Sequence, residues 1–247
     1  MILEGLNPRR RRELVRASMR VYAVTDGRWL AGRSLVDVVD QAIRGGATFV
    51  QLREKDASHE RRVELARQIA PVCACAGVPF VIDDDVECAL QVGADGVHVG
   101  QSDEPCSRAR ALLGPAAIVG VSVGTVEQAL QAQRSGADYL GVGAIWATAT
   151  KTDAEVPGIE GLRRICAAVD VPCVAIGGIK RDNVGRLAGT GVDGVAVVSE
   201  IFAAADPLAA ARGLLGACER AGVGSAAALG GPCGAGDAGA VGGGRSR

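Results

Sequence analysis

Residues 79–101 read "PFVIDDDVECALQVGADGVHVGQ" and contain the repeating unit that decides the fold. Two short runs rich in Val and Ile, 79–84 and 96–101, are separated by a longer segment that closes on Gly-Ala-Asp. Apolar runs of this length are typical of buried β-strands, and a glycine at the end of the intervening segment is typical of a helix stop. The stretch therefore predicts a strand, a helix, a turn and a second strand.

The same unit repeats along most of the chain. Further runs at 20–26, 48–54, 117–122, 138–145, 172–178 and 194–199 bring the number of predicted strands to eight, with helix-length segments such as 34–46, 58–77 and 125–137 between them. Eight such units in about 200 residues predict an α/β fold, a single (β/α)8 TIM barrel. A doubly wound open sheet is the alternative, but no GxGxxG motif follows the first run.

The two ends of the chain differ from this pattern. Residues 1–19 carry "RRRR" at 9–12 with no apolar segment after it, so we expect a basic flexible leader rather than a secretory signal. Residues 221–247 are mostly Gly and Ala without an apolar face, which predicts a disordered tail. The catalytic barrel is expected to span residues 20–220.

Composition limits the possible functions. Hydrophobic residues make up 48% of the 247 residues and aromatic residues only 3%, which suits a core of buried parallel strands. A net charge of −1 gives no electrostatic case for nucleic acid or an anionic membrane, and no run approaches the roughly 18 apolar residues of a membrane helix. Eight scattered cysteines without CxxC spacing predict buried free thiols and a cytoplasmic location.

Barrel enzymes place their chemistry at the carboxyl ends of the strands, so the residues there are the candidates. In "QLREK", alternation sends Gln51 and Arg53 to the same side, and Lys55 follows. A guanidinium near the barrel interior needs an anion, either a protein carboxylate or a substrate phosphate. Both alternatives stay open on this pattern.

Two carboxylates end neighbouring predicted strands. Asp84 follows the third run and Asp103 follows the fourth, so they can approach each other at the mouth and would need a cation between them. Oxygen ligands beside phosphate-binding groups suggest Mg²⁺, completed by water and substrate oxygens. Alternatively, each Asp caps the helix that follows it.

The remaining strand ends carry hydroxyl groups, glycines and one more cation. They supply Ser122, the stretch Thr148-Ala149-Thr150-Lys151, Gly178, and the pair Val198 and Ser199. In this fold the ends of the seventh and eighth strands usually hold a phosphate group. The mouth is therefore expected to have one anion site suited to a diphosphate and another suited to a monophosphate.

Six stretches together resemble the thiamine-phosphate synthase family: "YAVTD", "QLREKD", "VIDDDVECALQVGADGVHVGQSD", "ADYLGVGAIWATATKTDA", "VAIGGI" and "GVAVVS". They lie in order within roughly residues 20–213. The resemblance implies a Mg²⁺-dependent transferase that joins a hydroxymethylpyrimidine diphosphate to a thiazole phosphate and releases pyrophosphate. Its partners would be these small molecules, with no nucleic acid and no membrane; the oligomeric state stays open.

The resemblance also implies roles for individual residues. Arg53, Lys55, Ser122 and Lys151 would contact the diphosphate and act in catalysis, and Asp84 and Asp103 would bind Mg²⁺. The substrate-binding set would be Gln51, Leu52, Arg53, Glu54, Lys55, Asp83, Ser122, Thr148, Ala149, Thr150, Lys151, Gly178, Val198 and Ser199.

Three positions depart from the family pattern. Asp83 stands where Asn is usual, Gly124 where His is frequent, and Ala147 where Pro is usual. Asp83 is the most consequential, because an ionised carboxylate would face the diphosphate. A thiazole tautomerase-like isomerase and a non-catalytic phosphate-binding relative are the alternatives. His98 is expected to be a hydrogen-bonded barrel histidine and His59 a solvated one.

Overall fold

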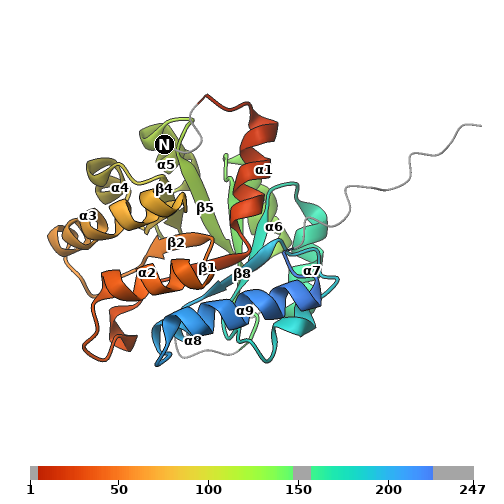
Figure 1. Ribbon diagram of the computed structural model, residues 1–247. Helices are drawn as coiled ribbons and strands as arrows, with labels where there is room; N and C mark the ends of the chain where they lie inside the picture. Colours follow the sequence, from red (N-terminus) through yellow and green to blue (C-terminus); the bar gives the residue numbers. More distant parts are fainter. Residues whose placement is uncertain (1–4, 147–156, 225–247) are drawn as a thin grey trace, which may run out of the picture.

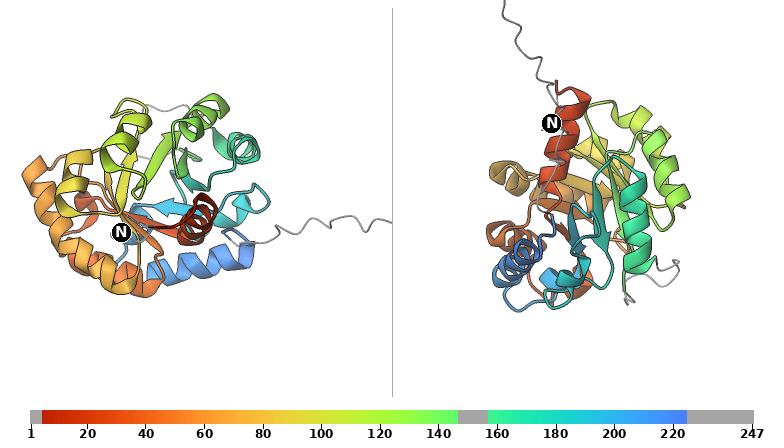
Figure 2. Two further views of the ribbon diagram at one scale, coloured as in Figure 1. Left: turned by 90° about the horizontal axis from the view of Figure 1, so that it is seen from above. Right: turned by 90° about the vertical axis from the view of Figure 1, so that its right-hand side faces the viewer.

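The computed structural model describes residues 5–146 and 157–224. Within them, eight parallel strands form a closed barrel in which each strand pairs with its sequence neighbours and β8 pairs with β1. Helices surround the strands (Figures 1 and 2). The predicted (β/α)8 barrel is confirmed, and the open-sheet alternative is excluded because the sheet has no free edge.

Each strand begins within one residue of the start of a predicted apolar run and ends within two residues of its end. They are β1 (Val21–Val24), β2 (Phe49–Leu52), β3 (Phe80–Asp83), β4 (Gly96–Val99), β5 (Ile118–Val123), β6 (Tyr139–Gly143), β7 (Cys173–Ile176) and β8 (Gly194–Val197).

The helices are α1 (Pro8–Ser18), α2 (Leu35–Gly45), α3 (His59–Ala76), α4 (Val86–Val92), α5 (Cys106–Leu113), α6 (Val126–Arg134), α7 (Gly158–Ala168), α8 (Ser199–Phe202) and α9 (Pro207–Ala221), with 3₁₀ turns η1 (Gly27–Trp29) and η2 (Val184–Leu187). The connection from β7 to β8 contains η2 in place of an α-helix. The eight units are therefore not identical.

The helix boundaries follow from capping residues. Ser34, Ser58 and Thr125 precede α2, α3 and α6, and each accepts a hydrogen bond from a backbone N–H of the first turn. Gly46 and Gly77 end α2 and α3 in the left-handed region that glycine adopts without steric cost. The helices predicted over 34–46, 58–77 and 125–137 are confirmed.

Three of the seven aromatic side chains form a cluster inside the barrel. Tyr22, Phe49 and Tyr139 are fully buried, and their ring centroids lie 4.6 to 5.9 Å apart in edge-to-face contacts. A larger cluster of Val, Leu, Ile and Ala fills the layer between strands and helices. One small aromatic cluster therefore fills part of the barrel interior, although aromatic residues are few in the sequence.

The amino-terminal segment forms a helix, so the prediction of a flexible leader over residues 1–19 is wrong for residues 8–18. Asn7 caps α1, Val15 and Met19 are buried, and both pack with the aromatic cluster. Arg11 pairs with Asp138 at 2.7 Å. Figure 1 shows α1 standing at the end of the barrel where β1 begins. The helix closes the amino-terminal end of the barrel.

At the other end of the chain, α9 packs against α2 (Figure 1) and is followed by Gly222 and a buried Val223. The ordered chain therefore continues past the predicted boundary at residue 220. The tail prediction for 225–247 lies outside the described residues.

The described cysteines are all free thiols. Cys73, Cys88, Cys106, Cys173 and Cys218 are buried as predicted, Cys166 is partly buried and Cys75 is exposed. In the described part of the chain, no helix combines the length and apolar character that crossing a membrane requires.

Candidate active site at the carboxyl ends of the strands

A cavity of about 1000 Å³ opens at the carboxyl ends of the strands. Ten of the predicted site residues line it: Gln51, Arg53, Lys55, Asp83, Asp84, Asp103, Ser122, Gly178, Val198 and Ser199. They come from β2 to β5, β7, β8 and the loops that follow. A volume of this size is at the upper end of ordinary ligand pockets, which suits two small substrates together.

Alternation along β2 separates the residues of the "QLREK" motif. Gln51, Arg53 and Lys55 line the cavity, whereas Leu52 is fully buried in the layer beneath the helices. Glu54 accepts hydrogen bonds from Thr25 Oγ1 and the Gly27 backbone N–H, and it does not line the cavity. The side chains of Leu52 and Glu54 therefore do not line this cavity, and the substrate contact predicted for these two residues stays a prediction.

Arg53 lies between two carboxylates at the base of the mouth. Its Nε is 3.5 Å from Asp83 Oδ2, and its Nη1 is 3.9 Å from Asp26 Oδ2. These separations are long for direct charge-assisted hydrogen bonds. Both anions suggested for Arg53 remain compatible with this geometry: protein carboxylates balance it now, and a substrate phosphate could bind it more closely.

Asp84 and Asp103 lie near each other, as predicted. Asp84 Oδ2 accepts from Lys55 Nζ at 3.2 Å, and burial together with a hydrogen bond to Asp103 raises the pKa of Asp84. The alternative that Asp84 caps a helix is wrong, because Asp85 caps α4. Asp103 accepts from the Gly100 backbone N–H, and α5 begins after Pro105.

The donor set at Asp84 and Asp103 fits Mg²⁺. In residues 5–146 and 157–224, no group of three or more His, Cys, Asp or Glu side chains could hold a metal ion by itself. Two carboxylates beside a phosphate site are nevertheless the usual protein contribution to a Mg²⁺ site, because water and substrate oxygens complete the octahedron. The geometry is compatible with a substrate-completed site.

Asp83 is held by Gln51 as well as by Arg53. Gln51 Nε2 donates to Asp83 Oδ1 at 2.6 Å. Burial and the neighbouring charge of Asp84 raise the pKa of Asp83 well above its usual range. The carboxylate that departs from the family pattern therefore points at Arg53, the same cation that a diphosphate would need.

A chain of hydrogen bonds crosses the barrel interior from Gln51 to Ser122. Tyr22 donates to Gln51 Oε1, so its oxygen accepts from Tyr139 at 2.8 Å. Tyr139 in turn contacts His98 Nδ1 at 2.9 Å, and His98 Nε2 contacts Ser122 Oγ at 2.9 Å. The barrel histidine is hydrogen-bonded, as predicted.

The direction of donation along these hydrogen bonds determines which role the Ser122 hydroxyl takes. Because the Tyr139 proton goes to Tyr22, His98 must donate from Nδ1, and in the neutral ring Nε2 is then an acceptor. The Ser122 hydroxyl therefore donates to His98 and presents lone pairs to the cavity. A contact from Ser122 to a diphosphate requires the hydroxyl to turn.

The ends of β7 and β8 form the other side of the cavity. Gly177 and Gly178 adopt φ angles of +95° and +69°, which glycine tolerates, and a Cβ at Gly177 would lie 2.6 Å from Ala144 Cβ. Asn183 holds this turn by donating to the Gly178 carbonyl. The backbone is thus fixed in a conformation that leaves room for a ligand beside Val198 and Ser199.

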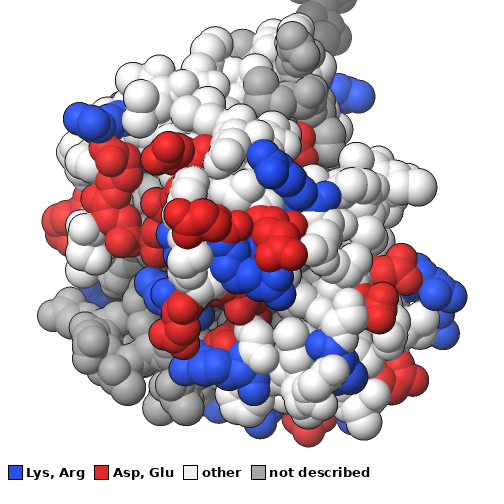
Figure 3. All heavy atoms as spheres, turned by 90° about the vertical axis from the view of Figure 1, so that its left-hand side faces the viewer, with Lys and Arg blue, Asp and Glu red and all other residues white. Residues whose placement is uncertain are grey.

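Four predicted residues fall outside the described chain. Thr148, Ala149, Thr150 and Lys151 belong to the segment 147–156 between β6 and α7, and their predicted roles stay predictions. His59 is a partly exposed side chain at the start of α3, in keeping with the prediction; its Nδ1 lies 2.9 Å from Asp85 Oδ2, and this hydrogen bond raises the His59 pKa. On the side of the molecule that lies to the left in Figure 1, acidic and basic side chains form adjacent groups (Figure 3).

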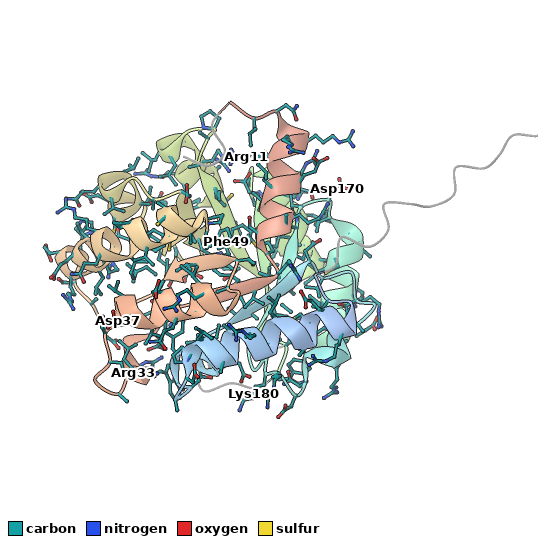
Figure 4. All side chains as sticks on the ribbon, viewed as in Figure 1. Arg11, Arg33, Asp37, Phe49, Asp170 and Lys180 are labelled. Atoms are coloured by element: carbon teal, nitrogen blue, oxygen red, sulfur yellow. The ribbon has the colours of Figure 1, made fainter. Side chains whose placement is uncertain are left out.

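Sequence reasoning did not identify several residues that line the cavity: Trp29, Gln101, Gln128 and Lys180. Lys180 could have been found, since it follows the predicted seventh strand at the carboxyl end where this fold binds ligands. Figure 4 shows Lys180 and Arg33 at the opposite end of the barrel from Arg11.

Taken together, the fold and the mouth define a (β/α)8 barrel equipped to bind phosphorylated small molecules: cations, a carboxylate pair and glycine turns surround one cavity. The comparisons specify the family. A family model described as thiamine monophosphate synthase matches residues 21–201. The chain belongs to that family.

Individual relatives agree with this assignment. The chain is 49% identical over 195 residues to a thiamine-phosphate synthase from Moorella thermoacetica, covering 78% of this chain and 93% of that protein. It is 51% identical over 196 residues to one from Chloroflexus aurantiacus, covering 79% and 90%. A solved structure of a thiamine phosphate pyrophosphorylase from Pyrococcus furiosus has a TM-score of 0.78 and 39% identity, covering 84% of this chain and 98% of that one.

Proposed function

We propose that the protein is a thiamine-phosphate synthase, a cytoplasmic transferase that acts in thiamine biosynthesis. In the proposed reaction, the ring nitrogen of a thiazole phosphate forms a bond to the methylene carbon of a hydroxymethylpyrimidine diphosphate. The bond from that carbon to the diphosphate oxygen breaks, and pyrophosphate leaves with the electron pair. The observation that carries the proposal is the convergence of Arg53, Lys55 and the Asp84–Asp103 pair on one cavity, in a chain of this family.

The chemical demand of this reaction is the charge that grows on the departing diphosphate. Arg53 and Lys55 would meet that charge, since both reach the cavity from the end of β2. Fixed cations aimed at developing charge are among the strongest catalytic devices that proteins have. The aminopyrimidine ring can support positive charge on the methylene, so bond breaking can run ahead of bond making.

Asp84 and Asp103 would hold Mg²⁺ together with diphosphate oxygens and water. When bound, the ion would neutralise part of the negative charge of the leaving group. Lys55 lies 3.2 Å from Asp84 and lines the same cavity, so it would be available to the diphosphate if Asp84 held the ion.

The thiazole phosphate would bind at the ends of β7 and β8. Gly178, Val198 and Ser199 line this side of the cavity, and the turn fixed by Asn183 keeps the backbone accessible to a phosphate. Thr148, Ala149 and Thr150 would complete the site. Lys180 lines the same side and supplies a cation that the family resemblance did not include.

The Arg53–Asp83 contact favours one competing function, that of a non-catalytic phosphate-binding relative. If Asp83 retains Arg53, the diphosphate loses a main partner while the β7–β8 side still binds a monophosphate. Such a protein would bind thiazole phosphate and would not release pyrophosphate.

Magnesium-dependent release of pyrophosphate from the two substrates is the deciding measurement. A synthase releases one pyrophosphate for each thiamine phosphate formed, and chelation of Mg²⁺ stops both. A tautomerase would change the thiazole phosphate without pyrophosphate release. Saturable thiazole phosphate binding without turnover would identify the non-catalytic relative.

Lys151→Ala tests the role proposed for the segment after β6. We expect kcat to fall more than the thiazole phosphate KM rises, because a cation that meets the leaving group acts mainly in the transition state. Steady-state kinetics with each substrate varied in turn checks this. An unchanged kcat with a higher thiazole phosphate KM would assign Lys151 to the monophosphate instead.

A further inference from the structure

Trp29 is a large apolar side chain at the rim of the cavity. It is 37% exposed, and it lines the mouth together with Gln51 and Arg53. Within residues 5–146 and 157–224, the other exposed large apolar residues are Leu90 and Leu112, neither of which lines the mouth. Isolated exposed apolar residues are ordinary, so exposure alone does not indicate a role for Trp29. The contacts that fix its loop supply the further evidence.

Glu54 holds the loop that carries Trp29. Its Oε1 accepts from Thr25 Oγ1 at 2.8 Å and its Oε2 accepts from the Gly27 backbone N–H at 2.9 Å. Burial raises the pKa of Glu54, so the carboxylate occupies a site that costs it hydration. A Cβ at Gly27 would lie 2.7 Å from Glu54 Oε2, which shows how closely this loop fits the carboxylate.

Arg33 holds the same loop from the opposite side. It donates to the carbonyls of Trp29 and Leu30 within the loop. It also donates to the carbonyls of Phe202 and Ala204 at the end of α8, at 2.6 and 2.7 Å. The loop is therefore tied both to β2, which carries the diphosphate cations, and to the segment after β8, beside the proposed monophosphate site.

Glu54 and Arg33 fix the loop that carries Trp29, and such fixation is typical of a side chain that forms one wall of a binding site. We propose that Trp29 stacks against an aromatic heterocycle of the substrates, and that Glu54 is a positioning residue that acts through Trp29. This inference rests on the proposed function, in which both substrates carry a flat heteroaromatic ring. It gives Glu54 a role that needs no direct contact with the ligand.

Steady-state kinetics of Trp29→Ala, Trp29→Phe and the control Leu112→Ala test the stacking. Leu112 is also large, apolar and exposed, at 50%. We expect Trp29→Ala to raise the KM of one substrate by about tenfold, with kcat largely kept, because both the stack and the apolar contact area of the indole are lost. Trp29→Phe should stay within about threefold of wild type.

The two arms of this experiment identify the ring. A raised KM for the pyrimidine diphosphate assigns the stack to the pyrimidine, and a raised KM for the thiazole phosphate assigns it to the thiazole. If Trp29→Ala keeps both KM values near those of wild type, as Leu112→Ala is expected to do, the stacking proposal is overturned. A wild-type protein that forms no thiamine phosphate would instead refute the proposed function, so the two failures are distinguishable.

The role of Glu54 is tested by combining variants. We expect Glu54→Ala to raise the same KM as Trp29→Ala, and the double variant to be no worse than Trp29→Ala alone. Glu54→Gln serves if the alanine variant does not fold, since its amide NH₂ would face one of the two donors while its oxygen keeps the other. Equal losses from Glu54 substitution with and without Trp29 would show that Glu54 acts independently, and would overturn its role as a positioning residue.

Discussion

The two ends of the barrel use charged side chains in opposite ways. At the amino-terminal end, Asp138 receives Arg11 and Arg110 together with the Val119 backbone N–H, and Arg16 pairs with Asp193 at 2.8 Å. At the mouth, the nearest carboxylate oxygens to Arg53 among the residues that the structure describes lie at 3.5 and 3.9 Å.

This difference separates stability from function within a single fold. The largely buried Arg11–Asp138 pair and the partly exposed Arg16–Asp193 pair, both with short hydrogen bonds, hold α1 against the end of the barrel. At the mouth, Arg53 has long contacts to carboxylates, and burial raises the pKa values of Asp83 and Asp84. A ligand that binds there can form shorter and stronger contacts than the protein makes by itself. Variants at the two ends should therefore change different measured quantities.

The largest effect is expected for Asp138→Ala at the amino-terminal end. Removing this carboxylate leaves two arginines and one N–H without their partner, which typically costs 3–5 kcal/mol for a buried pair and lowers Tm by about 10 °C in a chain of this size. Thermal unfolding measures the loss, and kcat/KM at 25 °C should stay near wild type. Glu13→Ala is the matched control on α1, because the pairs of Glu13 with Arg9 and Arg10 are exposed. A fall of less than about 3 °C for Asp138→Ala would contradict the comparison.

Lys55→Met should show the opposite behaviour at the mouth. Its side chain is 54% exposed, so its pair with Asp84 contributes little to stability and Tm should move by no more than about 2 °C. The loss of a cation facing the diphosphate should lower kcat/KM by about a hundredfold. Arg61→Met, which removes an exposed pair with Glu64 on α3, is expected to change neither quantity. A large fall in Tm for Lys55→Met without a lower kcat/KM would show that charges at the mouth contribute to stability rather than to function.

Asp83→Asn sharpens the comparison by removing a competitor for Arg53. The variant leaves the guanidinium without its carboxylate partner on β3, so we expect kcat/KM for the pyrimidine diphosphate to rise by about tenfold, corresponding to about 1.4 kcal/mol. The gain should be largest at low Mg²⁺, and the thiazole phosphate KM should barely move. Steady-state kinetics across a Mg²⁺ titration checks this. An equal or lower kcat/KM would mean that Asp83 is a working ligand.

The smallest effect is expected when residues 225–247 are deleted. The Gly- and Ala-rich composition provides no apolar face to dock, so Tm and kcat/KM should stay nearly unchanged. The deletion keeps Val223, which is buried. Thermal unfolding of the shortened chain is the measurement, and a fall of more than about 5 °C would show that the tail packs on the barrel.

The barrel was predictable from sequence because its strands are short runs rich in Val and Ile and its turns are marked by glycine. α1 was not predicted, because a run of four arginines resembles a solvated leader and the partners of Arg11 and Arg16 lie more than 100 residues away. The local signal was present in Asn7 and Pro8, a helix cap followed by proline at the first turn. A long-range ion pair has no comparable signal in the local sequence.

The site was predictable where strand alternation and strand ends determine it. Gln51, Arg53, Asp84 and Asp103 meet at the mouth for that reason. The same alternation implies that Glu54 points away, but the family resemblance included it as a contact. Trp29 and the Tyr22–Tyr139 link depend on how distant segments pack, so no local pattern indicates them.

The position of α1 has a consequence for how the protein is made. α1 is synthesised before the strands of the barrel, yet Asp138 and Asp193 lie 127 and 177 residues after their arginine partners. At a synthesis rate of about 5–20 residues per second, Arg11 waits on the order of ten seconds for Asp138 to be made. During that interval Val15 and Met19 lack the barrel interior on which they later pack. α1 therefore docks late although it precedes the barrel in the chain, and the nascent protein carries an uncovered apolar face until β8 is complete.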